Sequence, residues 1–393
     1  MKKSLAIFAE GDLRYFGGAE KYIIELSKRL KNFDITIFSP KTNKDIRLEE
    51  SKIKEVLKAD LEFFKTVNIP IVKEKIPLSF GGLSALAKLN KFDVIYIVDP
   101  DTPILFMILL SLKFTRKKVK VIFSGHDPDF FRFLKARPQK NTFARRVLLK
   151  LYRPIQKAVL FKIPNIHVIN TFDLRRLKEL GYKGKIYYIP NFLYYDINQI
   201  KIKQNKKEFI VLFGGRLSVY HKGIDILIKI IEETIKKNKN IKFHIFGSGE
   251  DGQELIEKLS KKYPSNVKYL GFLPNLGLTP NSQIENEYAN ASLFILTSRI
   301  ESFPLVTLEA QAHGLPIIAF DIKGPHDLIK NDFQGKLIEP FKIEDFVEAI
   351  LCYYKLWKEG KLSETYKSQI IDHVFSTYSD KKIIPKLEKM LTS

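Results

Sequence analysis

The sequence lacks two features that would place it in a disulfide-bonded or membrane-spanning class. Cys352 is its only cysteine, which excludes an internal disulfide and a metal site built from several cysteines. Its longest apolar run, ILFMILLSL at 104–112, is roughly half of what a membrane-spanning helix needs, so we expect a helix buried against a sheet. The start, MKKSLAIFAEGD, reaches Glu10 and Asp12 too soon for a signal peptide. We expect instead a buried first strand in a cytoplasmic protein.

Acidic side chains are few compared with basic ones. The chain of 393 residues has 66 Lys and Arg against 44 Asp and Glu, a formal net charge of +22. Such an excess of basic residues favours an anionic partner. The candidates are nucleic acid, a phosphorylated small molecule and an acidic membrane surface. A general enrichment of the proteome in lysine is the alternative explanation.

The positive charge is densest in residues 132–162, which contain ten Lys and Arg and no Asp or Glu. Apolar residues at 143, 147, 148 and 151 share one helix face beside basic ones. This pattern predicts peripheral contact with an anionic membrane, on its cytoplasmic face. A helix packed on a sheet, with solvated lysines, explains it as well. Nucleic-acid binding is the main rival from another class, but the segment contains no recognisable recognition motif, and we expect no nucleic-acid partner.

Short β-branched and aromatic runs alternate with amphipathic stretches along the chain. The expected strands are LAIFA, DITIFS, DVIYIV, KVIFS, IHVIN, FIVLFGG, IKFHIFG, VKYLG, LFILTS and PIIAF. This alternation predicts parallel sheets with helices on both faces, hence an α/β fold of doubly wound domains. The length predicts two of them, and a Pro-Asn breaker followed by a lysine-rich stretch in 189–209 marks the boundary. We expect domains at 1–192 and 193–375, and a helix at 376–393 that packs back on the first domain.

Two glycine-containing loops are suited to phosphate. Open α/β sheets bind ligands beyond the carboxyl ends of their strands, where helix N-termini present N–H groups and a positive dipole end. Gly17 and Gly18 precede an amphipathic helical pattern, and a strand ending in GG at 214–215 is followed by Arg216 and Lys222. Two cations in such a loop suit a diphosphate. A simple turn and solvated loop cations are the alternatives.

A third loop carries the nominal dinucleotide fingerprint GxGxxG, at Gly247, Gly249 and Gly252. The next strand, VKYLG, does not end in the acid that would hold the ribose of NAD. The pattern also opens the second strand–helix unit of its domain and not the first. It therefore predicts a tight turn that lines another nucleotide rather than a nicotinamide or flavin site.

Glu301 and Glu309 lie eight positions apart in RIESFPLVTLEAQAHGLP. Pro304 fits the first helical position and Ser302 the N-cap. Glu301 then precedes the helix, while Glu309 lies more than one turn inside it. A carboxylate accepts two hydrogen bonds side by side, which suits a vicinal diol such as a ribose. Taken alone, the two acids are better explained as an N-terminal acid favoured by the helix dipole and an ordinary helix glutamate.

Taken together, GGAEKYIIELSKRL, GGRLSVYHKGIDILIKI, FGSGE and SRIESFPLVTLEAQAHGLPIIAFDIKGPHDLI resemble the GT4 family of retaining glycosyltransferases. The resemblance covers almost the whole chain in order and is most specific in the Glu-x7-Glu segment. It implies the GT-B fold, in which two Rossmann-like domains face each other across a cleft. It also implies transfer of a hexose-type sugar from a nucleoside-diphosphate sugar to a glycan or lipid-linked acceptor, in glycan, polysaccharide or glycoprotein-glycan assembly. A non-catalytic sugar-nucleotide-binding subunit is a second rival.

The resemblance also implies roles for particular residues. Glu309 looks like the acid that grips the donor ribose. Glu301 looks like the acid beside the donor sugar, and His126, after the strand KVIFS, matches a histidine that points at that sugar. We take His126 and Glu301 as the candidate catalytic residues, without assigning Glu301 as a nucleophile, because a path with the leaving phosphate as base is favoured for this family. A core or loop histidine is the alternative for His126.

The expected diphosphate contacts are Arg216 and Lys222, with Gly17 and Gly18 approaching from the other domain. The remaining expected donor contacts are Ser302, Phe303, Pro304, Leu305 and Val306 at the helix start, and Gly249, Glu250 and Leu273 near the base.

Two Asp-x-Asp sequences, VDPD at 98–101 and HDPD at 126–129, raise the question of a metal. Both lie in the first domain, away from the phosphate loops, and the two cations Arg216 and Lys222 take the place of a divalent ion. We therefore expect no essential metal and no cofactor besides the donor. In DIKGPHDLI, His326 and Asp327 stand where many relatives have glycines followed by Glu. This variant is similar to surface-polysaccharide enzymes and favours a UDP-sugar.

Overall fold

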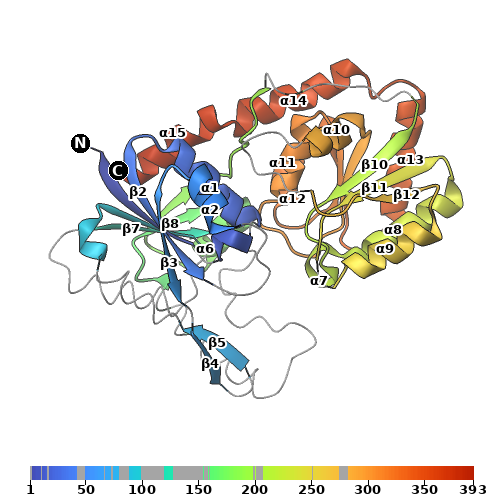
Figure 1. Ribbon diagram of the computed structural model, residues 1–393. Coiled ribbons are helices and arrows are strands. Elements are labelled where there is room, and N and C mark those ends of the chain that lie inside the picture. Colours follow the sequence, from blue (N-terminus) through green and yellow to red (C-terminus); the bar gives the residue numbers. More distant parts are fainter. Residues whose placement is uncertain are drawn as a thin grey trace. The chain divides into compact units, whose positions relative to one another are not determined.

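The structure of the protein is a computed structural model that divides the chain into two compact units (Figure 1). Unit 1 comprises residues 1–190 and 383–393, and unit 2 comprises residues 191–382. The structure describes residues 2–9, 11–15, 17–41, 49–65, 67–71, 74–78, 88–98, 119–126, 154, 158, 160–197, 200, 207–249, 251–273 and 282–393.

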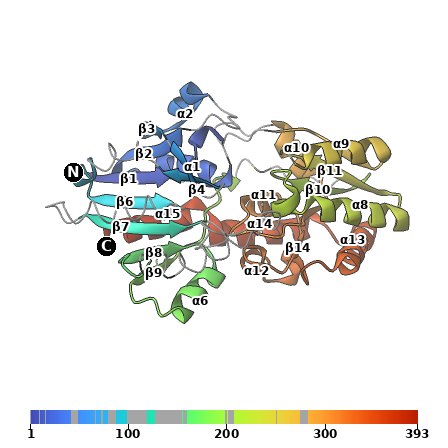
Figure 2. The same ribbon diagram turned by 90° about the horizontal axis from the view of Figure 1, so that it is seen from below.

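Unit 1 is built on a seven-stranded sheet in the order β3-β2-β1-β6-β7-β8-β9, in which every pair is parallel. Figure 2 shows β1, β6, β7, β8 and β9 side by side in this order. A two-stranded antiparallel sheet, β4-β5, is separate. The strands are β1 Lys3–Ala9, β2 Phe33–Lys41, β3 Asp60–Lys65, β4 Val67–Ile71, β5 Glu74–Leu78, β6 Val94–Val98, β7 Lys120–Gly125, β8 Asn165–Val168 and β9 Lys185–Tyr188.

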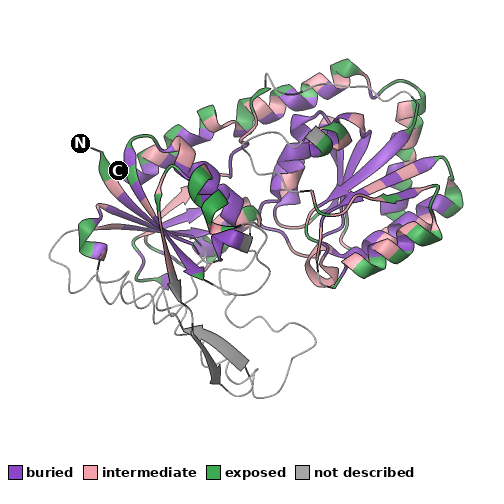
Figure 3. Ribbon diagram, viewed as in Figure 1, coloured by how far each residue is buried: buried purple, intermediate pink, exposed green. Residues whose placement is uncertain are grey.

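The central strands of unit 1 are buried along most of their length (Figure 3), as expected for a parallel sheet with both faces covered. Phe8, Ile95, Ile97 and Phe123 contribute to one core cluster. Within its described residues, the helices of this unit are α1 Gly18–Arg29, α2 Glu50–Val56 and α6 Thr171–Glu179, with 3-10 turns at Leu13–Tyr15 and Leu89–Lys91.

Unit 2 has a six-stranded parallel sheet in the order β12-β11-β10-β13-β14-β15. The strands are β10 Phe209–Gly214, β11 Ile241–Phe246, β12 Val267–Tyr269, β13 Leu293–Leu296, β14 Ile317–Phe320 and β15 Gly335–Ile338. The chain runs outward from β10 to β12 and then returns to the other side of β10 at β13, so the order reverses between β10 and β13. Ligands of doubly wound folds bind beyond the carboxyl ends of the strands at such a point.

The sheet of unit 2 separates two apolar cores. Along β10, Val211 and Phe213 belong to the core that contains α8 and α13, whereas Ile210 and Leu212 belong to the core on the α10 and α11 side. Alternate side chains of a strand point to opposite faces, so β10 is buried on both. The helices are α7 Val219–Lys222, α8 Ile224–Lys237, α9 Gln253–Lys262, α10 Ser282–Asn290, α11 Leu305–Ala312, α12 Pro325–Leu328, α13 Ile343–Lys358 and α14 Glu364–Tyr378, with a 3-10 turn at Asp332–Gln334.

The last helix, α15 Asp380–Thr392, contains Pro385 and enters unit 1 at residue 383. There, Lys120 Nζ donates to the carbonyl of Met390 (2.5 Å), and Asn32 Nδ2 donates to Glu388 (3.1 Å). Near residue 190, where the chain first goes from unit 1 to unit 2, the amide of Leu193 donates to the carbonyl of Tyr378 (2.7 Å). Within the described part of the chain, no helix is both long enough and apolar enough to cross a bilayer.

The predicted fold of two parallel-sheet α/β domains is confirmed, and all ten expected strands are present. The strands that the sequence pattern missed are β3, β9, β15 and the β4-β5 pair. β9 is half exposed at a sheet edge and β15 has four residues, so neither has a long apolar run. The helices expected at 104–112 and around 143–151 lie outside the described residues.

Candidate functional site

Lys222 and Glu301 form an ion pair beyond the carboxyl ends of the two central strands of unit 2. Lys222 is the last residue of α7, which follows β10, and Glu301 lies in the loop after β13. Lys222 Nζ donates to Glu301 Oε1, and Ser298 Oγ donates to the same oxygen (2.7 Å). The side chains of Lys222 and Glu301 are 15% and 9% exposed. A nearly buried pair of opposite charges therefore lies at the point where the strand order reverses.

Gly223 sets the backbone path next to this pair. Its φ of +66° lies in the left-handed region, and a Cβ there would lie 2.2 Å from the carbonyl oxygen of Thr297. Thr297 Oγ1 donates to the carbonyl of Lys222 (3.0 Å), which ties the two loops together. Only glycine satisfies both the dihedral angle and the close approach.

Arg299 joins the same two loops by a bidentate ion pair. Its Nη1 and Nη2 donate to Asp225 Oδ1 and Oδ2 (2.8 and 2.6 Å), and its amide donates to the carbonyl of His221 (2.9 Å). The hydrogen-bonded guanidinium lowers the pKa of Asp225. The loop that carries Glu301 is therefore fixed to the start of α8 by charge-assisted bonds.

Arg216 lies two residues after the end of β10 and its side chain is exposed. The three glycines of GxGxxG lie against the loop that carries it. A Cβ at Gly247 would lie 1.7 Å from the carbonyl oxygen of Gly215, and Cβ atoms at Gly249 and Gly252 would lie 2.2 and 2.5 Å from that of Leu217. Close packing of the two loops requires these glycines. Glu250 lies outside the described residues, and Leu273, beyond β12, packs partly buried against the α10–α11 core.

The expected cap of α11 is wrong. The N-cap is Pro304 and not Ser302, and the first helical residue is Leu305 and not Pro304. The residue before a proline is disfavoured in helical geometry, so Phe303 cannot start the helix. Among the described residues, the buried hydroxyls of Ser302 and Thr307 have no hydrogen-bond partner. The amides of Leu305 and Val306 have no acceptor within the helix, as at any helix start.

Glu309 is buried inside α11 and accepts hydrogen bonds from two phenols. Tyr194 Oη donates to Oε1 (2.6 Å) and Tyr288 Oη to Oε2 (3.2 Å). Sequence reasoning found Glu309 but missed both tyrosines, and it also missed Ser298 beside Glu301. No sequence signal marks either tyrosine, because their contacts with Glu309 form only when separate segments of unit 2 pack together.

His126 of unit 1 is buried directly after β7. Its ring lies 4.6 Å from that of Tyr22 and 5.9 Å from that of His167, centroid to centroid. Burial lowers the pKa of His126 well below its ordinary value. Gly17 is the N-cap of α1 and Gly18 its first residue, and a Cβ at Gly18 would meet no atom within 4 Å. Neither glycine has a positive φ, so their backbone conformation does not require glycine. The feature of this loop is instead the open space beside Gly18.

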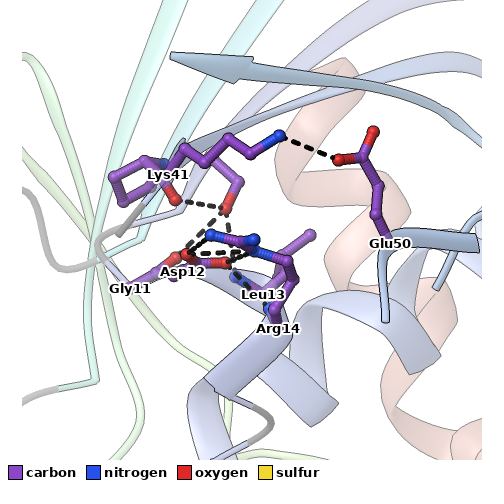
Figure 4. Close-up of polar contacts among 8 residues, drawn as sticks. Gly11, Asp12, Leu13, Arg14, Lys41 and Glu50 are labelled. Atoms are coloured by element: carbon purple, nitrogen blue, oxygen red, sulfur yellow. Dashed lines mark hydrogen bonds and ion pairs between the residues drawn. The ribbon is translucent and has the colours of Figure 1, made fainter. Parts of the chain in front are cut away.

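The segment after β1 is held by a buried ion pair (Figure 4). Arg14 Nη2 and Asp12 Oδ2 are 2.7 Å apart, and the hydrogen bond to Asp12 raises the pKa of Arg14. Ser39 Oγ accepts from the amide of Leu13 (3.0 Å) and donates to the carbonyl of Gly11 (3.3 Å). These bonds position the chain that leads to Gly17 and Gly18.

The expected site residues thus fall into two groups. Unit 2 brings Lys222 next to Glu301 and carries the start of α11 at Leu305. Unit 1 carries Gly17, Gly18 and His126. In the described ranges, no three His, Cys, Asp or Glu side chains gather in a way that would hold a metal ion. Most of the two Asp-x-Asp sequences lies outside those ranges.

Two protein-family models match the chain, one on each half. The model described as Glycosyltransferase Family 4 matches residues 16–194 and that described as Glycosyl transferases group 1 matches residues 196–369. Poly(ribitol-phosphate) alpha-N-acetylglucosaminyltransferase of Staphylococcus aureus is 29% identical over 60% of this chain and 43% of its own length. The chain therefore spans less than half of that relative. Amylovoran biosynthesis glycosyltransferase AmsD of Erwinia amylovora is 26% identical over 80% of this chain and 81% of its own length.

The fold is also found among solved structures. Anabaena HepE in complex with UDP superposes with a TM-score of 0.72 over 100% of both chains, at 17% identity. The two matched halves correspond to two parallel-sheet units, as in the GT-B fold. The chain belongs to the GT4-type family of glycosyltransferases.

Proposed function

We propose that this protein is a retaining glycosyltransferase that moves a hexose-type sugar from a nucleoside-diphosphate sugar to a glycan or lipid-linked acceptor. The observation that carries the proposal is the Lys222–Glu301 pair at the strand reversal of unit 2. A cation and an acid are held there next to a helix start, where a diphosphate and a sugar would meet.

The charges of this site suit departure of a nucleoside diphosphate. The leaving group gathers negative charge as the glycosidic bond breaks. Lys222, Arg216 and the first amides of α11 would stabilise that charge, and such groups act most strongly in the transition state. Retention of configuration follows if the leaving phosphate accepts the proton of the acceptor hydroxyl on the same face of the sugar.

Glu301 and Glu309 would bind different parts of the donor. Glu301, at the ion pair, would contact the sugar hydroxyls, and Glu309 would accept hydrogen bonds from the ribose. The two acids are therefore not a general acid and base pair. His126, in unit 1, stays a candidate catalytic residue. Burial lowers its pKa, so it would act as an uncharged imidazole.

Relatives support a UDP-sugar donor and a role in glycan assembly. HepE was solved with UDP, and the two curated relatives are named for poly(ribitol-phosphate) and amylovoran. We propose a UDP-sugar donor and a role in glycan assembly, with residues 132–162 in peripheral contact with an anionic membrane.

We propose further that no metal ion is essential, because Lys222 and Arg216 supply positive charge in the diphosphate loop. Chelation with EDTA should leave turnover unchanged. Activity that is abolished by chelation and restored by Mg²⁺ or Mn²⁺ would reject this part of the proposal.

The donor is tested by a panel of UDP-, GDP- and ADP-sugars. Thermal unfolding of the full chain is measured with each nucleotide sugar, and released nucleotide is measured in parallel. We expect stabilisation by UDP-sugars and slow hydrolysis of one of them. Stabilisation without any turnover, even with acceptor present, would favour a non-catalytic binding subunit. Polynucleotide binding that persists in high salt would favour the nucleic-acid alternative.

A further inference from the structure

We propose that Tyr194 and Tyr288 are positioning residues that hold the Glu309 carboxylate in the orientation that grips the donor ribose. The inference rests on the proposed function, because it needs a nucleotide whose ribose meets Glu309. It adds two side chains that neither the Glu-x7-Glu segment nor the glycine loops indicate.

The first observation is that each carboxylate oxygen of Glu309 has its own phenol donor. Tyr194 Oη lies 2.6 Å from Oε1 and Tyr288 Oη lies 3.2 Å from Oε2. The phenols come from different parts of unit 2, so the carboxylate is held from two sides. A carboxylate accepts about four hydrogen bonds, so two phenols are compatible with two further bonds from a diol.

The second observation is burial. Glu309 is 6% exposed and Tyr288 is fully buried. Burial, together with the Glu309 charge, raises the pKa of Tyr288 well above its ordinary value, so its hydroxyl keeps the proton that it donates. A buried carboxylate needs such charge-assisted bonds to offset its lost hydration. The bonds also remove its rotational freedom before a ligand arrives.

The third observation is that Tyr288 is itself fixed. His313 Nδ1 donates to the carbonyl of Glu309 (2.8 Å), and its Nε2 lies 2.6 Å from Glu285 Oε2. The rings of His313 and Tyr288 stack with centroids 4.9 Å apart. Glu285 and Tyr288 are one turn apart on α10, while Glu309 and His313 are one turn apart at the end of α11. Two parallel links therefore join the helices and hold the phenol.

Tyr194 approaches from the segment that follows Pro190, where the chain enters unit 2. Its ring lies 5.7 Å from that of Tyr195, and Tyr195 lies 5.7 Å from the ring of His313. The amide of the preceding Leu193 donates to the carbonyl of Tyr378 (2.7 Å). Backbone and ring contacts thus hold Tyr194 where it meets Glu309.

The experiment measures binding of UDP and of 2′-deoxy-UDP to the full chain by calorimetry. In the wild type, loss of the hydroxyl that bonds a charged acceptor should weaken binding roughly tenfold or more. In Tyr288→Phe and Tyr194→Phe, the Glu309 carboxylate is no longer oriented, so the protein should discriminate less between the two nucleotides. We expect the ratio of the Kd for 2′-deoxy-UDP to the Kd for UDP to fall to within about threefold. Because the ratio compares two ligands on one protein, a general loss of stability does not change it.

Tyr353→Phe is the matched control. Tyr353 is a buried tyrosine of α13 whose hydroxyl bonds Tyr366, so the variant removes a phenol from the same unit and should keep the wild-type ratio. A wild-type ratio in both Tyr288→Phe and Tyr194→Phe, or tighter UDP binding by either, overturns the positioning role. If the wild type binds UDP but does not discriminate, the ribose role of Glu309 fails and the inference with it. If it binds neither nucleotide, the proposed UDP-dependent function itself fails.

Discussion

Lys222 and Glu301 are 79 positions apart in the chain and share one ion pair in unit 2. Glu301 Oε1 accepts from both Lys222 and Ser298, so one carboxylate oxygen is held by protein donors. In the proposed reaction Lys222 serves twice, as the cation for the diphosphate and as the group that orients Glu301. Its removal should therefore affect chemistry more than donor binding.

Lys222→Met tests this expectation. Loss of a preorganised donor at developing charge costs roughly 10²–10³-fold in kcat, and we expect a smaller change in the KM for donor. Lys229→Met, on α8, is a control that also removes one positive charge. Steady-state kinetics with varied donor separate the two parameters. A variant that changes only KM would assign Lys222 to ground-state binding alone.

His167 is a second residue whose environment has a measurable consequence. It is fully buried, its Nε2 lies 2.7 Å from the carbonyl of Ile189, and its Nδ1 lies 2.8 Å from both Tyr96 Oη and Ser124 Oγ. Burial lowers the pKa of His167 to about 4. Between the ordinary value of about 6.5 and 4, the unfolded chain binds a proton that the folded chain does not.

The stability of the protein should therefore fall as the pH drops from about 6.5 towards 4. His167 alone accounts for about 3 kcal/mol, and buried His126 acts in the same direction. Denaturant unfolding at several pH values measures the slope, which His167→Gln should flatten. Equal slopes in wild type and variant would show that His167 does not remain neutral in the fold.

At the scale of elements, the loops after β10 and β13 decide the geometry of the candidate site. Gly223 and Gly360 have nearly the same left-handed φ, +66° and +69°. A Cβ at Gly223 would meet the carbonyl oxygen of Thr297 at 2.2 Å, whereas a Cβ at Gly360 would meet nothing within 4 Å. Alanine substitutions at the two positions therefore separate the free-energy cost of the left-handed dihedral angle from that of the close contact.

Gly360→Ala should lower the unfolding free energy by roughly 1–2 kcal/mol, the cost of a left-handed alanine. Gly223→Ala should cost clearly more, because backbone must move as well. It should also weaken nucleotide binding, since Lys222 is the adjacent residue. Denaturant unfolding and UDP titration of both variants check this, and equal costs would contradict the close approach.

Much of the element order was predictable, because strands such as FIVLFGG and LFILTS are continuous apolar runs between amphipathic helices. The start of α11 was predicted wrongly. Pro304 disfavours helical geometry at Phe303, and this restriction outweighed the capping preference of Ser302. Residue types and spacing drew attention to Glu301, Glu309 and Lys222, but only the resemblance to the GT4 family made them site candidates. Sequence reasoning did not identify Tyr194 and Tyr288, because their contacts with Glu309 arise only when separate segments of unit 2 pack together.

At the scale of the whole molecule, the net charge of +22 is the dominant property. We expect the protein to float with liposomes that contain anionic lipid, and to be released by salt, because surface charges are screened within about a Debye length. Reversing the charge of several Lys and Arg in 132–162 should reduce flotation, whereas the same number of changes on α8 and α9 should have less effect. Equal flotation with neutral and anionic vesicles would contradict electrostatic docking.

The central claim is that unit 2 binds and activates a sugar nucleotide through Lys222, Glu301 and Glu309. It is tested most directly by nucleotide release from a UDP-sugar, measured for the wild type, Glu301→Ala and Glu309→Ala. We expect turnover by the wild type, loss of kcat in Glu301→Ala, and a raised donor KM with a smaller change in kcat in Glu309→Ala. Turnover that neither substitution impairs would contradict the claim.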